Sequence, residues 1–504
     1  MNKKTLKRVR ITLASICFAL ITLMFLDFTG TLHHYLSWLA KIQFFPAVMA
    51  LNFVIIALLV VLTLIFGRIY CSVICPLGVY QDFVQKIHSA RKKNRYNFSK
   101  GLPILRYIFL GIFIIAIIFG ASSLVALLAP YSSYGRIAQN LFQPLYIWVN
   151  NLFALVAEHF NSYAFYSKEV WIRSLPTFII AVVCFLVITV MAWVGGRTYC
   201  NTICPIGTVL GFLSRFSWLK INIDESKCVK CDICTKNCKA KCIDGKNNVI
   251  DHSRCVSCGD CMAKCPKEAI NYSHAKAKNT EDTIKKESTE TKKEVDNSKR
   301  AFLFTSLAVG SSVAFAQEKG KVDGGLAIIE DKVAPQRATK IVPSGAKSIK
   351  NFEKRCTACQ LCVSKCPNDV LRPSTSLMNM MQPEMSYERG YCRPECTACS
   401  EVCPTGAIER IDKAEKSSIK IGTAHWIKKN CIPLTDGVEC GNCAKHCPSG
   451  AILMVNSIPG DEKSVKIPTI NEERCIGCGA CENLCPSRPF SAIYVEGIEN
   501  HRTI

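Results

Sequence analysis

Most of the 31 cysteines in this 504-residue chain fall into tight groups whose members are two or three residues apart. Cysteines this close together are poorly placed to pair with one another, and disulfide frameworks belong to small exported folds. Thiolates grouped in this way are typical ligands of iron–sulfur clusters and of zinc. The spacing therefore directs attention to metal centres.

Two groups in the middle of the chain have the C-x2-C-x2-C-x3-C spacing of bacterial ferredoxins. They are Cys228, Cys231, Cys234 and Cys238, and Cys255, Cys258, Cys261 and Cys265. Three close thiolates on one loop hold three irons of a four-iron cluster, while the fourth thiolate reaches the neighbouring cluster. By this rule Cys265 joins the first three cysteines of the first group, and Cys238 joins those of the second. Two complete groups in tandem favour iron over zinc.

The residue after Cys238 departs from this pattern. Lys239 stands where a proline usually follows the fourth cysteine, and Cys242 lies only four residues after Cys238. The ligand at this position is therefore either Cys238 or Cys242.

Four further groups lie between residue 356 and the C-terminus. The first and last have the standard spacing, the middle two are widened at their first gap, and a proline follows each fourth cysteine. The groups are Cys356, Cys359, Cys362 and Cys366; Cys392, Cys396, Cys399 and Cys403; Cys431, Cys440, Cys443 and Cys447; and Cys475, Cys478, Cys481 and Cys485. Together with the first two groups, they predict six [4Fe-4S] clusters.

A cluster held by four thiolates carries single electrons and has no open iron for a substrate. No C-x-x-C unit is followed directly by histidine, and no glycine-rich nucleotide loop follows a predicted strand. Neither covalent haem nor bound NAD or ATP is indicated. The chain thus shows no substrate site of its own.

The composition points to a membrane. The formal net charge is +23, but 49% of the residues are hydrophobic, so the basic residues are better explained as cytoplasmic loops than as a nucleic-acid surface. Met1 to Arg10 carries five basic residues and no acid ahead of an apolar run. No small-residue cleavage site follows this run, so we interpret it as an anchor and not as a cleaved signal.

Four apolar runs are predicted to span the bilayer, and each is near the roughly 20 residues that a spanning helix needs. They are Ile11–Leu26, Phe44–Phe66, Tyr107–Leu128 and Leu175–Val194. From Lys86 to Arg106 there are seven basic residues and no acid, which places this loop and the N-terminus in the cytoplasm. Leu141–Phe160 is interrupted by polar residues and is predicted to be an interfacial helix in an outer loop.

The membrane domain contains a repeat. Gly67-Arg68-Ile69-Tyr70-Cys71-Ser72-Val73-Ile74-Cys75-Pro76-Leu77-Gly78 is echoed by Gly196-Arg197-Thr198-Tyr199-Cys200-Asn201-Thr202-Ile203-Cys204-Pro205-Ile206-Gly207. Two related helix pairs are expected. If they pack about a pseudo-twofold axis, Cys71, Cys75, Cys200 and Cys204 converge into a metal or redox-thiol site at the cytoplasmic face; otherwise these thiols are inert packing. Cys17 and Cys184 lie inside spans and are expected to be packing residues.

Five segments follow from these patterns. They are a membrane domain at 1–215, a two-cluster ferredoxin domain at 216–274, a charged disordered linker at 275–300, an apolar segment at 301–317, and a four-cluster ferredoxin domain at 318–504. Ser298-Lys299-Arg300 before the apolar segment, and Ala314-Phe315-Ala316 at its end, are typical of a twin-arginine export signal with one arginine replaced by lysine. The alternatives for this segment are a fifth span and a buried helix. The expected fold class is an α-helical membrane domain with α+β ferredoxin domains.

These motifs carry a family resemblance. Residues 1–270, with paired C-x3-C-P motifs before a two-cluster ferredoxin, resemble NapH, the membrane ferredoxin subunit of periplasmic nitrate reduction. Residues 298–504 resemble its partner NapG and the related MauM ferredoxins. The resemblance implies a fusion of the two subunits that acts as a quinol dehydrogenase in the prokaryotic cell membrane and feeds a periplasmic terminal reductase. The first ferredoxin domain would then be cytoplasmic and the C-terminal one periplasmic.

Quinol oxidation also needs proton acceptors near the bilayer. The candidates near the predicted outer surface are Asp27, His33, His34, Glu158 and His159, with solvated loop residues as the alternative reading of each. Two other functions stay open: an accessory polyferredoxin that reduces or delivers metal during oxidase or reductase assembly, and a redox-sensing membrane regulator. The long second ferredoxin domain argues against the first, and the lack of a recognisable flavin site argues against the second.

Overall fold

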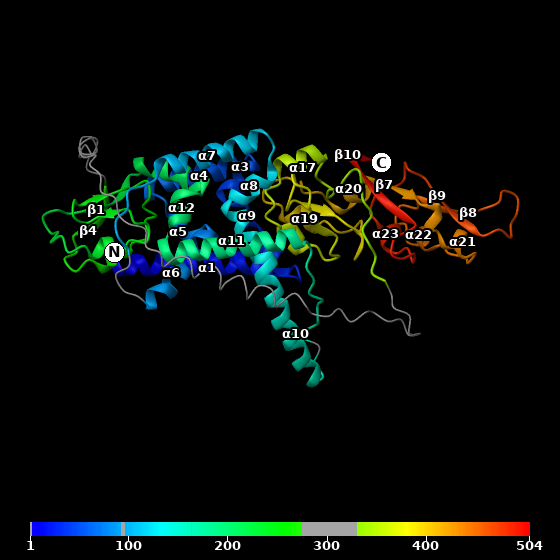
Figure 1. The fold of residues 1–504 in the computed structure, drawn as a ribbon, viewed down its shortest axis with the longest axis horizontal. Coiled ribbons are helices and arrows are strands. Elements are labelled where there is room, and N and C mark those ends of the chain that lie inside the picture. Colours follow the sequence, from blue (N-terminus) through cyan, green and yellow to red (C-terminus); the bar gives the residue numbers. More distant parts are fainter. Residues whose placement is uncertain (1–2, 92–95, 163, 275–329) are drawn as a thin grey trace, which may run out of the picture.

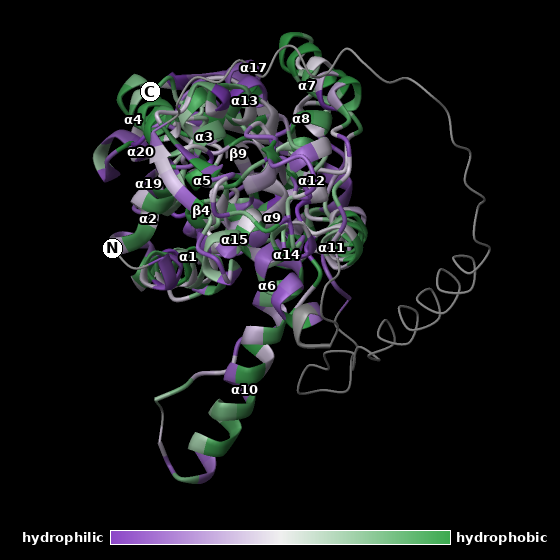
Figure 2. Ribbon diagram, turned by 90° about the vertical axis from the view of Figure 1, so that its left-hand side faces the viewer, coloured by the Kyte–Doolittle hydropathy of each residue, from purple (hydrophilic) through white to green (hydrophobic). Residues whose placement is uncertain are grey.

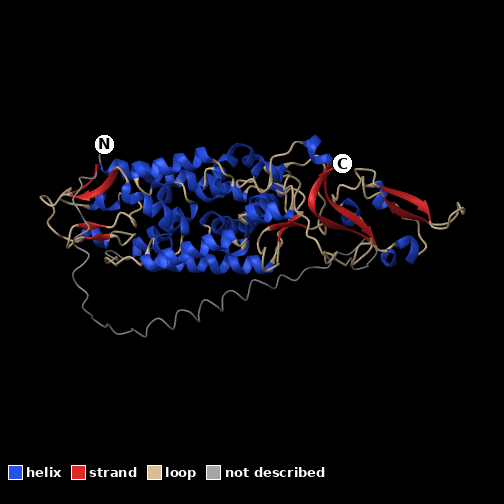
Figure 3. Ribbon diagram, turned by 90° about the horizontal axis from the view of Figure 1, so that it is seen from above, coloured by secondary structure: helices blue, strands red, loops and turns tan. Residues whose placement is uncertain are grey.

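The computed structural model describes residues 3–91, 96–162, 164–274 and 330–504. A bundle of helices forms the middle of an elongated molecule, and a cysteine-rich region caps each end (Figure 1). The strands lie at the two ends, where short helices accompany them, and the long helices lie between (Figure 3). The predicted linker 275–300 and apolar segment 301–317 fall outside the described residues.

The helical bundle is built from residues 3–216. Its helices are α1 (Lys3–Leu26), α2 (Thr31–Lys41), α3 (Phe44–Met49), α4 (Phe53–Phe66), α5 (Ile69–Val73), α6 (Pro76–Arg91), α7 (Pro103–Ile118), α8 (Ser122–Leu128), α9 (Pro130–Ile137), the π-helical η1 (Ala138–Phe142), α10 (Gln143–His159), α11 (Leu175–Gly195), α12 (Thr198–Thr202), α13 (Pro205–Leu213) and the 3-10 helix η2 (Ser214–Phe216). Among the described residues, α1 and α11 are the two helices that are long and apolar enough to cross a membrane.

The other two predicted spans are each broken in two. Phe44–Phe66 forms α3 and α4, because Leu51 has a positive φ and the Asn52 side chain caps the new helix by accepting a hydrogen bond from Ile55 N. Tyr107–Leu128 forms most of α7 and α8, and Gly120, with a φ of 71°, ends the first of them. A residue in the left-handed region interrupts the helical hydrogen bonds, so continuous spans were the wrong expectation here.

Apolar side chains on these helices face away from the bundle. On α4, Phe53 and Val54 are more than 70% exposed, and so are Ile104 and Ile118 on α7. The outer face of α11 is likewise apolar, and Figure 2 shows hydrophobic residues along the outside of the bundle. Exposed apolar surface of this extent is unusual for a protein surrounded by water.

The helix α10 projects from the bundle across the direction of α1 and α11 (Figures 1 and 2). It is largely hydrophobic, and Leu145, Trp148, Leu152 and Leu155 are exposed on it. The helix predicted over Leu141–Phe160 is thus present, and its position beside the bundle, not within it, agrees with a helix that does not span.

The two repeats form matching re-entrant hairpins. The long helices α4 and α11 run to the same end of the bundle, where α5 and α12 turn back into it and α6 and α13 return. The returning helix of each repeat packs against the long helix of the other: α6 contacts α11, and α13 contacts α4. The two repeats therefore interlock.

The first ferredoxin region caps the end of the bundle at which the N-terminus lies (Figure 1). Its strand β1 (Leu219–Ile223) pairs antiparallel with β4 (Ile270–His274), and β2 (Ile243–Asp244) pairs with β3 (Val249–Ile250). Two short helices, α14 (Ile233–Lys236) and α15 (Asp260–Lys264), complete it. An ion pair between Lys7 of α1 and Asp260, with an N–O distance of 2.8 Å, ties it to the N-terminal helix.

The C-terminal region caps the opposite end. Its helices are α17 (Ile349–Arg355), α18 (Leu361–Lys365), α19 (Ala398–Val402), α20 (Lys413–Ser418), η4 (Lys428–Asn430), α21 (Ile432–Thr435), α22 (Asn442–Lys445) and α23 (Ala480–Asn483). Three antiparallel strand pairs join them: β5 (Leu371–Pro373) with β6 (Pro383–Met385), β7 (Ile419–Trp426) with β10 (Ile493–Thr503), and β8 (Ile452–Asn456) with β9 (Lys466–Ile470).

Polar contacts hold this region to the bundle. Arg173, just before α11, donates to Val363 O at 3.0 Å and pairs with Asp369 at 2.9 Å. Ser122 of α8 donates to Glu353 O at 2.8 Å. Since the first ferredoxin region contacts the opposite end of the bundle, the length of the bundle separates the two ferredoxin regions.

Candidate metal centres

The first ferredoxin region has two cavities lined by cysteines. Cys228, Cys231 and Cys234 share one cavity with Cys265. Cys255, Cys258 and Cys261 share the other with both Cys238 and Cys242. The fourth cysteine of each group thus lies with the first three of the other, as the exchange rule predicts.

The backbone distinguishes Cys238 from Cys242. Five cysteines of the ferredoxin groups are followed by proline. After four of them, namely Cys265, Cys366, Cys403 and Cys447, the third following residue has a positive φ; Cys485 is the exception. Lys241 has a φ of 51° and stands in the same relation to Cys238. No such residue follows Cys242 at that distance, since Gly245 does not have a positive φ. Cys238 therefore occupies the usual backbone position of a fourth ligand.

Lys239, which stands where a proline usually follows the fourth cysteine, connects the domain to the bundle. Its ammonium group lies 2.7 Å from Asp82 of α6 and 3.3 Å from Asp260, and its carbonyl accepts a hydrogen bond from Arg197 N at 2.9 Å. Burial alone would raise the pKa of Asp260, but Lys239 and Lys7 outweigh it and hold the pKa well below its usual range. Cys242, with its sulfur 3.5 Å from that of Cys238, lines the same cavity as a neighbour.

Replacement of Cys238 by serine is expected to remove one cluster, with a loss of about four irons per chain. The matched change Cys242→Ser is expected to leave the iron content unchanged, because the backbone turn is built around Cys238. Iron analysis of both variants, purified without oxygen, checks this. Iron loss confined to Cys242→Ser would show that the missing proline has moved the ligand.

The C-terminal region contains two further exchanged pairs of groups. Cys356, Cys359 and Cys362 line a cavity with Cys403, while Cys392, Cys396 and Cys399 lie close to Cys366. In the same way Cys475, Cys478 and Cys481 share a cavity with Cys447, and Cys431, Cys440 and Cys443 share one with Cys485. The region is therefore two ferredoxin-like units in series.

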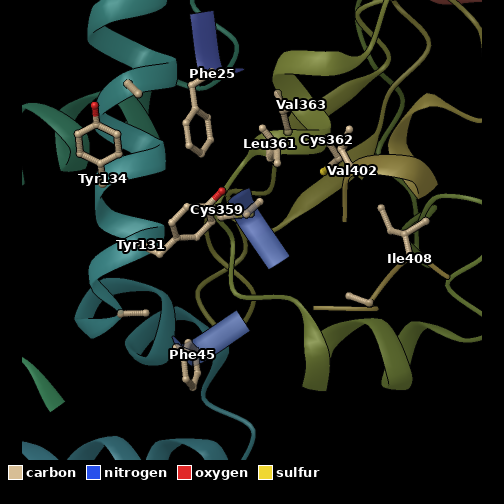
Figure 4. Packing of buried hydrophobic residues seen from close by; sticks show 14 of the residues in the cluster. Phe25, Phe45, Tyr131, Tyr134, Cys359, Leu361, Cys362, Val363, Val402 and Ile408 are labelled. Carbon is tan, nitrogen blue, oxygen red and sulfur yellow. The ribbon is translucent and has the colours of Figure 1, made fainter. Parts of the chain in front are cut away.

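The four groups form a row that begins at the helical bundle. In Figure 4, Tyr131 of α9 lies beside Cys359. A Cβ on Gly135 of the same helix would lie only 2.3 Å from Cys359 O, so this contact requires a glycine. Tyr387 lies near both Cys392 and Cys478, and Cys392 N donates to Cys478 O at 3.0 Å, which joins the second group to the group of Cys475. The group of Cys431 is the farthest from the bundle (Figure 1).

The cavities fit clusters better than single ions. Among the described residues, no group of three or more His, Cys, Asp or Glu side chains is spaced to hold one metal ion. A four-iron cluster places its thiolates farther apart than a single tetrahedral ion does, and each cavity is lined by four or five thiols.

The four cysteines of the repeats also come together. Cys71, Cys75, Cys200 and Cys204 are all buried at the tips of the re-entrant hairpins, and Cys204 lies close enough to the other three for their charges to interact. The convergence that the pseudo-twofold hypothesis predicts is therefore present. Cys17 and Cys184 are half-buried in α1 and α11, apart from this set.

Two buried arginines cross between the repeats. Arg68 donates to Cys200 O at 3.1 Å, and Arg197 donates to Cys71 O at 2.7 Å. Both side chains are fully buried. The sequence analysis gave them no role, although the Gly-Arg-x-Tyr-Cys motif that occurs in both repeats was a signal that could have drawn attention to them.

The predicted proton acceptors lie in different environments. His33 and Asp27 form a buried pair at the end of α1, with 3.1 Å between Nδ1 and the carboxylate. His34 is exposed beside Tyr35, and Glu158 and His159 are exposed at the tip of α10. The structure therefore brings together only one of the candidate sets.

Comparisons with known families agree with the cysteine pattern. A profile described as a 4Fe-4S binding domain matches residues 48–95 and again residues 177–224, which contain the two repeats. A 4Fe-4S dicluster domain matches residues 436–488, and another 4Fe-4S binding domain matches residues 248–271. The chain carries multiple 4Fe-4S clusters. No solved structure matches it.

Known proteins of the same kind are distantly similar. The methylamine utilization ferredoxin-type protein MauM of Methylobacillus flagellatus is 28% identical over 195 residues, which are 38% of this chain and 81% of MauM. The ferredoxin-type proteins NapG and NapF of Escherichia coli are 27% and 28% identical over 34% and 29% of this chain, and 79% of each relative is covered. The chain is thus a ferredoxin-type electron-transfer protein.

Proposed function

We propose that this protein is a membrane-bound quinol dehydrogenase module that passes electrons through six [4Fe-4S] clusters to a periplasmic terminal reductase. It combines a membrane part that resembles NapH with a four-cluster part that resembles NapG. The lipid bilayer, membrane quinol and the reductase are its partners in this proposal.

One observation carries the proposal: two ferredoxin regions cap opposite ends of a helical bundle with an apolar outer surface. The exposed side chains of α4, α7 and α11 fit a surrounding bilayer, where apolar surface needs no covering protein. The projecting helix α10 fits the interface between lipid and water. An electron path along the molecule would therefore run from one face of the membrane to the other.

The distribution of basic residues indicates which end of the bundle faces the cytoplasm. The basic N-terminal residues, Lys100 just before α7 and Arg106 at the start of α7 lie at the end of the first ferredoxin region, which fits the cytoplasmic face. The chain must then pass to the other end between His274 and Glu330, the stretch that contains the signal-like segment 301–317. An export route that accepts folded cargo suits a domain whose clusters are inserted first.

The buried pair Asp27–His33 is the proposed proton acceptor for quinol. Burial alone would raise the pKa of Asp27, but hydrogen bonds with His33, Thr29 and Gly30 outweigh it and hold the pKa well below its usual range. An ionised Asp27 accepts from Nδ1–H of His33, which leaves Nε2 as the acceptor. This Nε2 is buried and has no hydrogen-bond partner among the described residues.

The pair also lies beside the C-terminal region. The Lys365 ammonium group donates to Gly30 O in the turn that holds Asp27, and Lys365 is the neighbour of Cys366. A quinol headgroup at His33 would thus release its two protons one at a time through the histidine to water, and would pass its two electrons singly to two clusters of the nearby row.

Replacement of His33 by glutamine is expected to slow quinol-driven reduction of the clusters by about 100-fold or more, because a general base is lost. The control His34→Gln removes the exposed neighbour and is expected to have no effect. Bleaching of the cluster absorption on addition of quinol measures the rate, and dithionite shows that the clusters are intact. Equal rates in wild type and His33→Gln would exclude this site.

A further inference from the structure

We propose that Cys71, Cys75, Cys200 and Cys204 together hold a seventh iron–sulfur cluster, shared between the two repeats, which relays electrons between the two ferredoxin regions. The existence of this cluster does not depend on the proposed function. Its relay role rests on that function only in supposing that electrons move along the molecule.

The four thiols meet in a symmetric arrangement. A Cβ on Gly78 would lie 2.2 Å from Cys71 O, and one on Gly207 would lie 2.2 Å from Cys200 O. Each returning helix therefore starts against the carbonyl of a cysteine in its own repeat, which fixes that cysteine in the same way in both copies. Each repeat supplies only two thiols, and four are needed to fill the ligand positions of a cluster.

Hydrogen-bond donors surround the sulfur atoms. Gln81 Nε2 lies 3.2 Å from the sulfur of Cys200, and Gly207 N donates to that of Cys204 at 3.3 Å. The guanidinium groups of Arg68 and Arg197 each lie 3.9 Å from the first cysteine sulfur of their own repeat. Donors aimed at thiolate sulfur are the usual surroundings of an iron–sulfur cluster.

The charge of this site is unbalanced without an anion. Arg68 is 0% exposed, and its hydrogen bonds in the described part of the chain go to Asn201, Ser253 and the two cysteines, none of which is a carboxylate. Asp82, the partner of Arg197, is shared with Lys239 and Arg10.

A buried positive charge without a partner is costly. Neutral thiols would leave it uncompensated. A cluster ligated by four thiolates carries a net negative charge and balances it. Arg68 Nε and Arg197 Nη2 are also buried, and neither has a hydrogen-bond partner among the described residues. A negatively charged cluster beside them would compensate these groups as well.

The site also lies between the two ferredoxin regions. Arg68 contacts Ser253 O at 3.0 Å and lies near Cys255 on one side, and reaches Cys71 on the other. Tyr70, next to Cys71, lies near Tyr131, which in turn lies beside Cys359 (Figure 4). The proposed cluster is therefore the intermediate electron carrier between the groups of Cys255 and Cys359.

Each relay step moves one electron and no atoms. A reduced cluster of one ferredoxin region is oxidised by one electron as the shared cluster is reduced, and the shared cluster is then reoxidised by the other region. No bond forms or breaks, and no further oxidant is required.

The first test is the iron content of the unmodified full-length chain. Six four-iron clusters contain about 24 irons. Native mass spectrometry and chemical iron and sulfide analysis are expected to show about two or four irons more than this number. The double variant Cys71→Ser/Cys200→Ser is expected to lose that excess and to keep the rest, while the control Cys17→Ser keeps all of it. An unmodified chain with no more than six clusters' iron would overturn the proposal.

The second test addresses the relay. The protein is placed in sealed proteoliposomes, and membrane-impermeant dithionite is added on the side of the C-terminal region. In wild type the enclosed clusters of the first ferredoxin region are expected to become reduced through the chain, and in the double variant they stay oxidised while the outer clusters bleach. The same rate in both proteins would exclude the relay. Because quinol is absent, failure of the quinol proposal would leave this result unchanged.

Discussion

Protease added to right-side-out spheroplasts is expected to destroy an epitope within Lys350–Ile504 and to spare one within Cys228–Cys265. The two epitopes belong to regions that cap opposite ends of the bundle, and in the proposed function a bilayer around the apolar helices separates them. In the same proposal the first region, at the end with the basic N-terminal residues, faces the cytoplasm. The expected contrast is all or none.

Lysed spheroplasts provide the control, since both epitopes should then be lost. Protection of both regions in intact spheroplasts would mean that segment 301–317 is not an export signal and that the C-terminal clusters stay in the cytoplasm. Loss of both would mean that the N-terminal end is exported, which contradicts the charge argument.

The grouping of the cysteines was the most predictable part of this protein. Three cysteines on one short loop leave little freedom, and the exchange of Cys238 and Cys265 between cavities follows from the same local geometry. The exchange of Cys366 with Cys403, and of Cys447 with Cys485, extends the rule to the C-terminal region. Local spacing was enough because the cluster, not distant packing, dictates the loop.

The helical bundle was less predictable. Hydrophobic runs located all four apolar segments, but the breaks at Asn52 and Gly120 depend on single residues inside those runs. The re-entrant path of α5 and α12 could not be read from hydropathy, because residues buried against protein and residues facing lipid are equally apolar. Arg68 and Arg197 are charged residues in these otherwise apolar segments, which marks them as unusual, but only the fold shows what they contact.

The row of cysteine groups in the C-terminal region leads to the last prediction. Cys399 belongs to the second group of the row, whose fourth ligand Cys366 follows Lys365 beside the proposed quinol site, and Cys440 belongs to the group at the far end. If electrons enter from quinol at His33, they pass the group of Cys399 before the two outer groups. A change there should affect every later group, and a change at Cys440 should affect only the last.

Replacement of Cys399 by serine is therefore expected to abolish quinol-driven reduction of the two outer clusters, whereas dithionite, which reaches them directly, still reduces them. The matched variant Cys440→Ser is expected to lose one cluster and to leave reduction of the other three by quinol at the wild-type rate. Electron paramagnetic resonance of samples frozen after quinol addition distinguishes the clusters. If Cys440→Ser blocked reduction as fully as Cys399→Ser, electrons would enter at the far end of the molecule, and the bundle would be the exit from the row.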